Sequence, residues 1–113
     1  MKTVTIGVAS VEAMNSRIRR AFAGEKQGAF INFATPELLW KVITPKRWDV
    51  LRVMTGAGPV SIREVARRVQ QDVKSVHADV QALIKSGIID RTDKGQIVFP
   101  YQQVHVDFVL QAA

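Results

Sequence analysis

The sequence predicts one domain of the α+β class, on three observations. Apolar and polar residues alternate with the period of a β-strand near both ends of the chain, over 3–8 and over 104–110. Between these ends, apolar residues recur at the three- and four-residue spacings of helices, and several such segments begin with a helix-capping signal. The length of 113 residues suits a single core, and no low-complexity linker divides the chain.

Residues 1–43 are predicted to form an extension made of a strand and a helix. The strand at 3–8 has its larger apolar side chains on one side. An apolar stripe at helical spacing over 11–22 then predicts an amphipathic helix that ends near Gly24. The apolar segment at 30–33 is compatible with either a strand or a packed loop.

Two threonine–proline pairs, Thr35-Pro36 and Thr44-Pro45, predict the starts of two helices. The threonine hydroxyl caps the helix, and proline suits the first helical position because its missing N–H would have no partner there. The first helix is short, and the second runs to about Thr55, before a glycine–proline turn. We expect the following side chains of these helices in the core: Trp40, Trp48, Leu51 and Met54.

A capping box at 61–64 predicts a helix of about two turns, with the Ser61 hydroxyl accepting from the Glu64 N–H and Glu64 reaching back. Asp72 caps the next helix, which ends at Ser86-Gly87. A turn signal at 93–95 then predicts a hairpin between extended segments that begin at Ile88 and end at Phe99. The inward face of the long helix is predicted to contain Val73, Val76, Val80, Leu83 and Ile84.

The order of the elements at 44–99 is that of a winged helix-turn-helix: a helix, a short helix, a tight turn, a longer helix and a hairpin. The full prediction is therefore an α+β winged helix-turn-helix with an extra N-terminal strand and helix and a C-terminal strand. The C-terminal segment, 100–113, contains that last strand, and we expect the strand at 3–8 to be its partner.

The stretch from Leu83 to Arg91 resembles the corresponding passage of MarR-like and ArsR-like bacterial repressors. Nearly the whole chain is similar to a family of small prokaryotic MarR-like DNA-binding regulators, many of which are antitoxins encoded beside a toxin. The resemblance implies sequence-specific binding of double-stranded DNA, autorepression, a homodimer and a cognate toxin as protein partner. The matching segments are Thr3-Val4-Thr5-Ile6-Gly7, Leu39 to Arg47, Ser61 to Ala66, Asp72 to Val80, and Pro100-Tyr101.

The net charge of +6 favours an acidic partner such as a nucleic acid. Residues 44–99 contain ten basic and six acidic side chains, which leaves +4 on the predicted winged helix-turn-helix. Residues 1–43 contribute +3, mostly from the predicted amphipathic helix, and the last fourteen residues contribute −1.

The longer helix is expected to contact base edges through its N-terminal half. With the apolar stripe inward, Lys74, Ser75 and Ala78 point outward, and lysine can donate to guanine O6 and N7. His77 lies at the boundary of the two faces, as a structural residue or a base contact. MarR-like proteins often have a hydroxyl residue and an arginine where this chain has His77 and Ala78, which argues against strong guanine recognition there. We expect Asp79 to point sideways or to accept from cytosine.

Contacts with the DNA backbone are expected from three helices and the hairpin. Helix N-termini favour phosphate because their N–H groups are free and the helix dipole is positive there. The predicted backbone contacts are Lys46, Arg47, Ser61, Arg63, Arg67, Arg68 and Lys85, with Arg91 and Lys94 on the wing.

Other function classes find little support in the sequence. The chain has no cysteine, its two histidines are 28 positions apart, and its glycine-rich turn lacks the lysine of a phosphate loop. We therefore expect no enzyme, catalytic residue, metal or cofactor. No apolar run is long enough for a membrane span and no secretory signal is evident, which favours the cytoplasm.

A second function is an alternative: a winged-helix interaction module that neutralises a toxin, with little or no DNA binding of its own. The basic residues of the N-terminal helix, which the DNA interpretation does not need, favour it. Those arginines are either solvated or in contact with an acidic partner: Arg17, Arg19 and Arg20.

Overall fold

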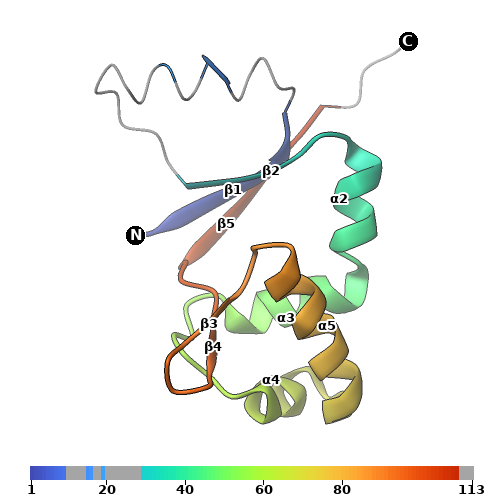
Figure 1. Cartoon of the computed structure of the whole chain (residues 1–113), viewed down its shortest axis with the longest axis vertical. Helices are drawn as coiled ribbons and strands as arrows, with labels where there is room; N and C mark the ends of the chain where they lie inside the picture. Colours follow the sequence, from blue (N-terminus) through green and yellow to red (C-terminus); the bar gives the residue numbers. More distant parts are fainter. Residues whose placement is uncertain (10–14, 17–18, 20–28, 110–113) are drawn as a thin grey trace.

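The computed structural model describes residues 1–9, 15–16, 19 and 29–109. A three-stranded sheet lies at one end of the molecule, and three helices with a hairpin lie at the other, joined by α2 (Figure 1). The elements in chain order are β1 (Thr3–Val8), β2 (Ala29–Phe33), α2 (Pro36–Val42), α3 (Pro45–Met54), α4 (Ile62–Val69), α5 (Val73–Lys85), β3 (Asp90–Arg91), β4 (Ile97–Val98) and β5 (Gln103–Asp107). The α+β class is thus confirmed.

The sheet has the order β2-β1-β5 and both pairings are parallel. The predicted partnership of the two terminal strands is confirmed, with Val4 opposite Val104 and Ile6 opposite Val106. The segment at 30–33 is a strand, not a loop. Gly7 lets β1 and β5 approach closely, because a Cβ atom there would collide with the carbonyl oxygen of Asp107.

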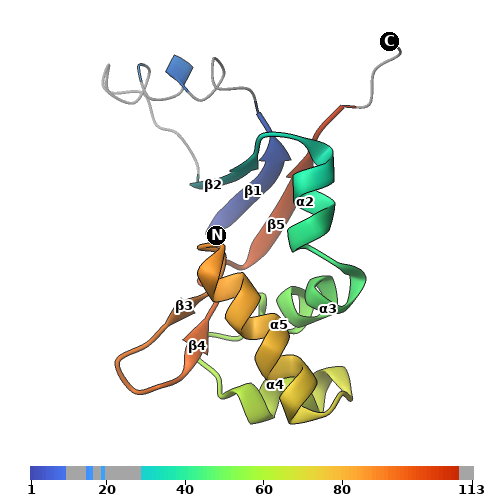
Figure 2. The same ribbon diagram turned by 45° about the vertical axis from the view of Figure 1, so that its right-hand side comes forward.

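Helices α3, α4 and α5 pack on one another, and the hairpin β3–β4 follows them directly (Figure 2). We call residues 45–98 the helix–hairpin unit. The loop between α3 and α4 pairs with β4 of the hairpin through an antiparallel bridge, in which Val60 and Ile97 exchange two backbone hydrogen bonds of 2.9 and 2.8 Å. The hairpin strands are two residues each, shorter than predicted, and the turn closes through the Gly95 N–H to the Thr92 carbonyl.

One continuous core links the sheet to the helix–hairpin unit. Val4 and Ile6 of β1 pack with Leu39 of α2 and with the buried faces of the three helices. Leu83 is fully buried, and its carbonyl accepts the Ile88 N–H where the chain leaves α5 for the hairpin. The sheet and the helices therefore share one core.

The predicted helix caps are confirmed in position. The side chains of Thr35, Thr44, Ser61 and Asp72 each accept a hydrogen bond from the backbone N–H three residues later. The second half of the capping box is wrong: the Glu64 carboxylate does not turn back toward Ser61 but pairs with Arg67 and Arg68 one turn ahead. Two guanidinium groups within reach outcompete one backbone N–H.

Several expectations about burial are wrong. Trp40 and Trp48 are not core anchors, since 57% and 39% of their surfaces are exposed and both line an apolar hollow. Val73, the first residue of α5, is 44% exposed. The last strand ends at Asp107, and its predicted residue Leu110 lies outside the described residues. The predicted amphipathic helix also lies outside them, apart from Asn15, Ser16 and Arg19, which are helical.

Candidate nucleic-acid interface

The N-terminal half of α5 forms an exposed ridge on the helix–hairpin unit. A tight turn joins α4 to it, with Gln70 in the left-handed conformation (φ 58°) and its N–H bonded to carbonyls of α4. Lys74, His77 and Ala78 are exposed and Ser75 is half-buried, so the residues predicted for base contact share one accessible surface. His77 is thus on the exposed face rather than at the boundary.

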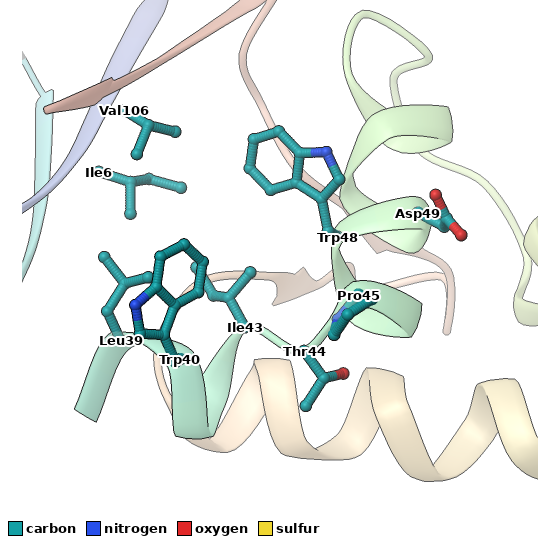
Figure 3. A pocket seen from close by; sticks show the side chains of 9 residues that line it. All are labelled: Ile6, Leu39, Trp40, Ile43, Thr44, Pro45, Trp48, Asp49 and Val106. Atoms are coloured by element: carbon teal, nitrogen blue, oxygen red, sulfur yellow. The ribbon is translucent and has the colours of Figure 1, made fainter. Parts of the chain in front are cut away.

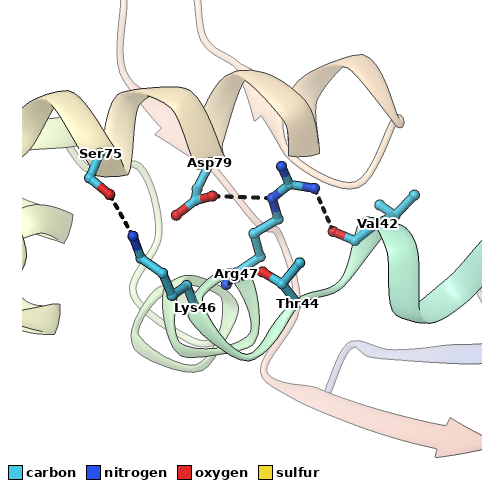
Figure 4. Close-up of polar contacts among 6 residues, drawn as sticks. All are labelled: Val42, Thr44, Lys46, Arg47, Ser75 and Asp79. Atoms are coloured by element: carbon cyan, nitrogen blue, oxygen red, sulfur yellow. Dashed lines mark hydrogen bonds and ion pairs between the residues drawn. The ribbon is translucent and has the colours of Figure 1, made fainter.

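The N-terminus of α3 lies beside this ridge (Figure 4). Lys46 donates from Nζ to the Ser75 hydroxyl over 2.7 Å, a contact between residues 29 positions apart. The structure thus places Lys46, predicted to contact the DNA backbone, next to Ser75, predicted to contact base edges. The ammonium group remains exposed, with two further donors available.

Arg47 has a different role from its neighbour. Its Nε donates to the Asp79 carboxylate over 3.2 Å, and a terminal nitrogen donates to the Val42 carbonyl over 2.9 Å. The Arg47 and Asp79 side chains are 24% and 15% exposed, so this half-buried pair ties α3 to α5 and to the end of α2 (Figure 4). Arg47 is therefore held inside the protein, against the prediction of a phosphate contact. Asp79 points sideways, as expected.

Helix α4 presents Arg63 at its exposed N-terminal turn, without a carboxylate partner among the described residues. Arg67 forms a two-pronged pair with Glu64, and Arg68 reaches the same carboxylate over 3.4 Å. The hydrogen bond from Arg67 lowers the pKa of Glu64, and the same bond raises the pKa of Arg67. Two arginines thus share one carboxylate, which leaves one net positive charge. The Ser61 hydroxyl is used as the helix cap.

The remaining predicted contacts are farther from the ridge. Lys85 is exposed in the last turn of α5, about 16 Å along the helix from Lys74. Arg91 and Lys94 are exposed on the hairpin, where Asp90 and Asp93 balance their charge. The hairpin itself therefore has no net charge, although its two cations point to solvent.

Ion pairs with carboxylates compensate some of the positive charges of the helix–hairpin unit and leave others uncompensated. Arg47, Arg52, Arg67 and Arg68 each face a carboxylate. In the described part of the chain, the cationic side chains of the unit without such a partner are Lys46, Arg63, Lys74, Lys85, Arg91 and Lys94. Of these six, Lys46 and Lys74 lie at the N-terminal half of α5, and Arg63 lies at the N-terminus of α4.

Two other features are absent from the part of the chain that the structure describes. No group of three or more His, Cys, Asp or Glu side chains there is arranged to hold a metal ion. None of the helices described combines the length and the apolar character needed to cross a membrane.

Comparison with known proteins gives one match. The sequence model of the HVO_A0114 protein family matches residues 42–106, a segment that contains the whole helix–hairpin unit and β5 almost to its end. No curated protein and no solved structure matches the chain.

Proposed function

The chain belongs to the HVO_A0114 family, and we propose that it is a regulator that binds a specific sequence in double-stranded DNA through a winged helix-turn-helix. One observation carries the proposal: the exposed N-terminal half of α5, whose neighbour Lys46 has no carboxylate partner in the part of the chain that the structure describes. Helix order, the tight turn before α5 and the hairpin after it agree with that architecture.

In this proposal α5 enters the major groove, which is wide enough for one helix. Lys74 and Ser75 contact base edges, and Ala78 offers a methyl group to thymine. His77, exposed beside them, is a further donor or acceptor. Lys46 turns from Ser75 toward a phosphate or a base when DNA is bound, because its ammonium group has donors to spare.

Backbone phosphates are contacted by the cations around α5. Arg63 lies at the N-terminus of α4, where the helix dipole also attracts phosphate. Arg67 and Arg68 supply one uncompensated charge beside it, and Arg91 and Lys94 reach the adjacent backbone from the hairpin. Arg47 is left out of this set because Asp79 and Val42 hold it.

The proposal includes a homodimer that represses its own gene. Helix-turn-helix dimers bind two half-sites about one helical turn apart, so the operator is expected to be a pseudopalindrome. A cognate toxin, encoded beside it, is the protein partner that fits the resemblance described above. The protein would act in the cytoplasm.

The test is a mobility-shift titration with DNA from upstream of the chain's own gene and with a shuffled duplex of equal length. We expect a discrete shift of the upstream DNA, with an affinity that falls steeply with salt, by about 0.9 in log K per log unit of salt for each phosphate contacted. A protein that shifts neither duplex, while it co-purifies with the product of the neighbouring gene, would contradict the proposal. That result would favour the alternative of a toxin-neutralising module.

A further inference from the structure

An apolar hollow of about 460 Å³, which we call the apolar groove, lies between the sheet, α2 and the start of α3 (Figure 3). Ile6 and Val106 face it from the sheet, Trp40 from α2 and Trp48 from α3. Trp40, Trp48 and Val106 on its rim are 39–57% exposed. Large apolar side chains that are exposed side by side are typical of a contact surface.

Strand β5 borders this groove and forms an edge of the sheet (Figure 2). In the order β2-β1-β5 it pairs with β1 and with no other strand of the described chain. An edge strand presents unpaired N–H and carbonyl groups, and these are a template for pairing with a strand of another chain. The exposed rim and the open edge therefore lie together, on one side of the molecule.

The backbone of β5 is oriented for such pairing at Val106. The Gln103 N–H donates to the Lys2 carbonyl over 3.3 Å, and the Asp107 carbonyl lies against Gly7, so both residues direct backbone groups to β1. Successive residues of a strand direct these groups to opposite edges. The N–H and the carbonyl of Val106 therefore point to the open edge.

The side chains of this segment are complementary to a second copy of the same segment. In an antiparallel pair with its two-fold axis at Val106, His105 lies opposite Asp107 and Val104 opposite Phe108. The imidazole and the carboxylate form a favourable cross-strand pair on one face of the sheet. The apolar pairs lie on the other face, which is the face of the apolar groove. An axis one residue to either side would set two histidines or two aspartates opposite each other.

We propose that the chain forms a homodimer in which the two copies of β5 pair antiparallel about Val106 and join their three-stranded sheets. Trp48 and Val104 line one small hollow, so Phe108 of the second copy, opposite Val104, lies beside Trp48. Phe108 also contacts Trp40 of its own chain edge-to-face, with 5.7 Å between the ring centroids. The aromatic side chains of both copies thereby cover the groove. The inference rests on the homodimer of the function proposed above and assigns its surface, but it uses no contact with DNA.

Cysteine cross-linking tests the position of the axis, because the chain has no cysteine of its own. In Val106→Cys the two thiols face each other, since directly opposite, hydrogen-bonded residues have Cα atoms about 5.5 Å apart, within the range of a disulfide. In the matched control Val104→Cys, the two thiols are about 13 Å apart along the strands, because residue 104 lies opposite residue 108. We expect oxidation with copper phenanthroline to link Val106→Cys at least tenfold faster, as measured by non-reducing electrophoresis.

A charge exchange tests the pairing of His105 with Asp107 in solution. Sedimentation equilibrium without DNA should show a wild type that dimerises as its concentration rises. His105→Asp sets carboxylates opposite each other at two symmetric positions and should weaken dimerisation about tenfold. The exchange variant, His105→Asp with Asp107→His, restores the pair and should return the affinity to within about threefold of wild type. Both side chains are exposed, so circular dichroism should show the same fold in all three proteins.

Three results would overturn this interface: a wild type that stays monomeric, equal cross-linking of the two cysteine variants, or an exchange variant as weak as His105→Asp. A monomer whose groove holds a co-purified small molecule or a strand of another protein would overturn it as well. A Val106→Cys dimer that shifts no DNA would refute the proposed function and leave the interface standing. A monomer that shifts upstream DNA would refute the interface alone.

Discussion

The helix–hairpin unit and the parallel sheet differ in the sequence distance of their contacts and in their charge. The unit is built from consecutive elements that begin with local caps, and it contains ten basic and six acidic residues. The sheet pairs strands that are 100 residues apart, with Thr3 opposite Gln103, and its three strands include one acidic residue, Asp107.

The two regions of this small protein therefore offer surfaces with different binding chemistry. The exposed cations gather on the unit, where a polyanion would be recognised, and the apolar groove opens beside the sheet. Helix α3 belongs to both sides, because Trp48 lines the groove and Arg47 holds α5. Single substitutions can therefore alter one region and leave the other intact.

Leu83→Ala should have the largest effect, because the side chain is fully buried between α5 and the rest of the unit. Removing a buried leucine costs about 2–5 kcal/mol of stability. Urea unfolding followed by circular dichroism measures the change. The control is Leu38→Ala, the same substitution at a leucine of α2 that is 46% exposed; equal losses in both would show that the core lies elsewhere.

Gly7→Ala should destabilise the sheet and leave the helix–hairpin unit unchanged. The added methyl group meets the Asp107 carbonyl, so β1 and β5 must move apart, and overpacking of this kind costs about 1–3 kcal/mol. We expect a lower thermal midpoint with unchanged DNA affinity at low temperature. Thr5→Ala, two residues earlier on the same strand face, removes atoms instead and is the control. Loss of DNA binding by folded Gly7→Ala would mean that the sheet also positions α5.

Lys74→Ala and Arg63→Ala separate two roles within the unit. Lys74 lies on the exposed ridge of α5, and its loss should weaken binding to the operator by about 1–3 kcal/mol while nonspecific duplex is less affected. Arg63→Ala should weaken both duplexes about equally and lower the salt slope by about one. Fluorescence anisotropy at several salt concentrations measures both. Identical profiles for the two variants would contradict these roles.

The pair of Arg47 and Asp79 tests whether α3 and α5 are tied together. In a double-mutant cycle of Arg47→Ala and Asp79→Ala, we expect a coupling energy of about 1 kcal/mol in folding stability, since each single change leaves a half-buried charge unpaired. If Arg47 instead bound phosphate, Asp79→Ala would release it and tighten DNA binding. An unchanged or weaker affinity for Asp79→Ala supports the structural role.

How much the sequence could predict depends on how far apart in the sequence the contacting residues are. The caps at Thr44, Ser61 and Asp72 depend on residues three positions away, so pattern alone located the helices. The role of Arg47 depends on Asp79, 32 positions later, and on how α3 meets α5. The exposure of Trp40 likewise follows from the gap between α2 and the sheet, which no local pattern records. The residues predicted for the interface therefore lie on the predicted elements, whereas the burial and pairing of Arg47 follow from contacts that the local pattern does not contain.

The smallest expected effect is the pH dependence of α4. The bond from Arg67 keeps the pKa of Glu64 below its ordinary value in the folded chain, so the ionised carboxylate stabilises the fold above the unfolded pKa. That contribution is lost as the pH falls from about 4.5 through the folded pKa. The thermal midpoint of wild type should therefore exceed that of Glu64→Gln at neutral pH, and the difference should vanish in acid. If the difference in thermal midpoint instead grew on acidification, the stabilising charge would lie outside α4. Arg67 and Arg68 could then no longer be counted as sharing the Glu64 carboxylate, with one positive charge left for DNA.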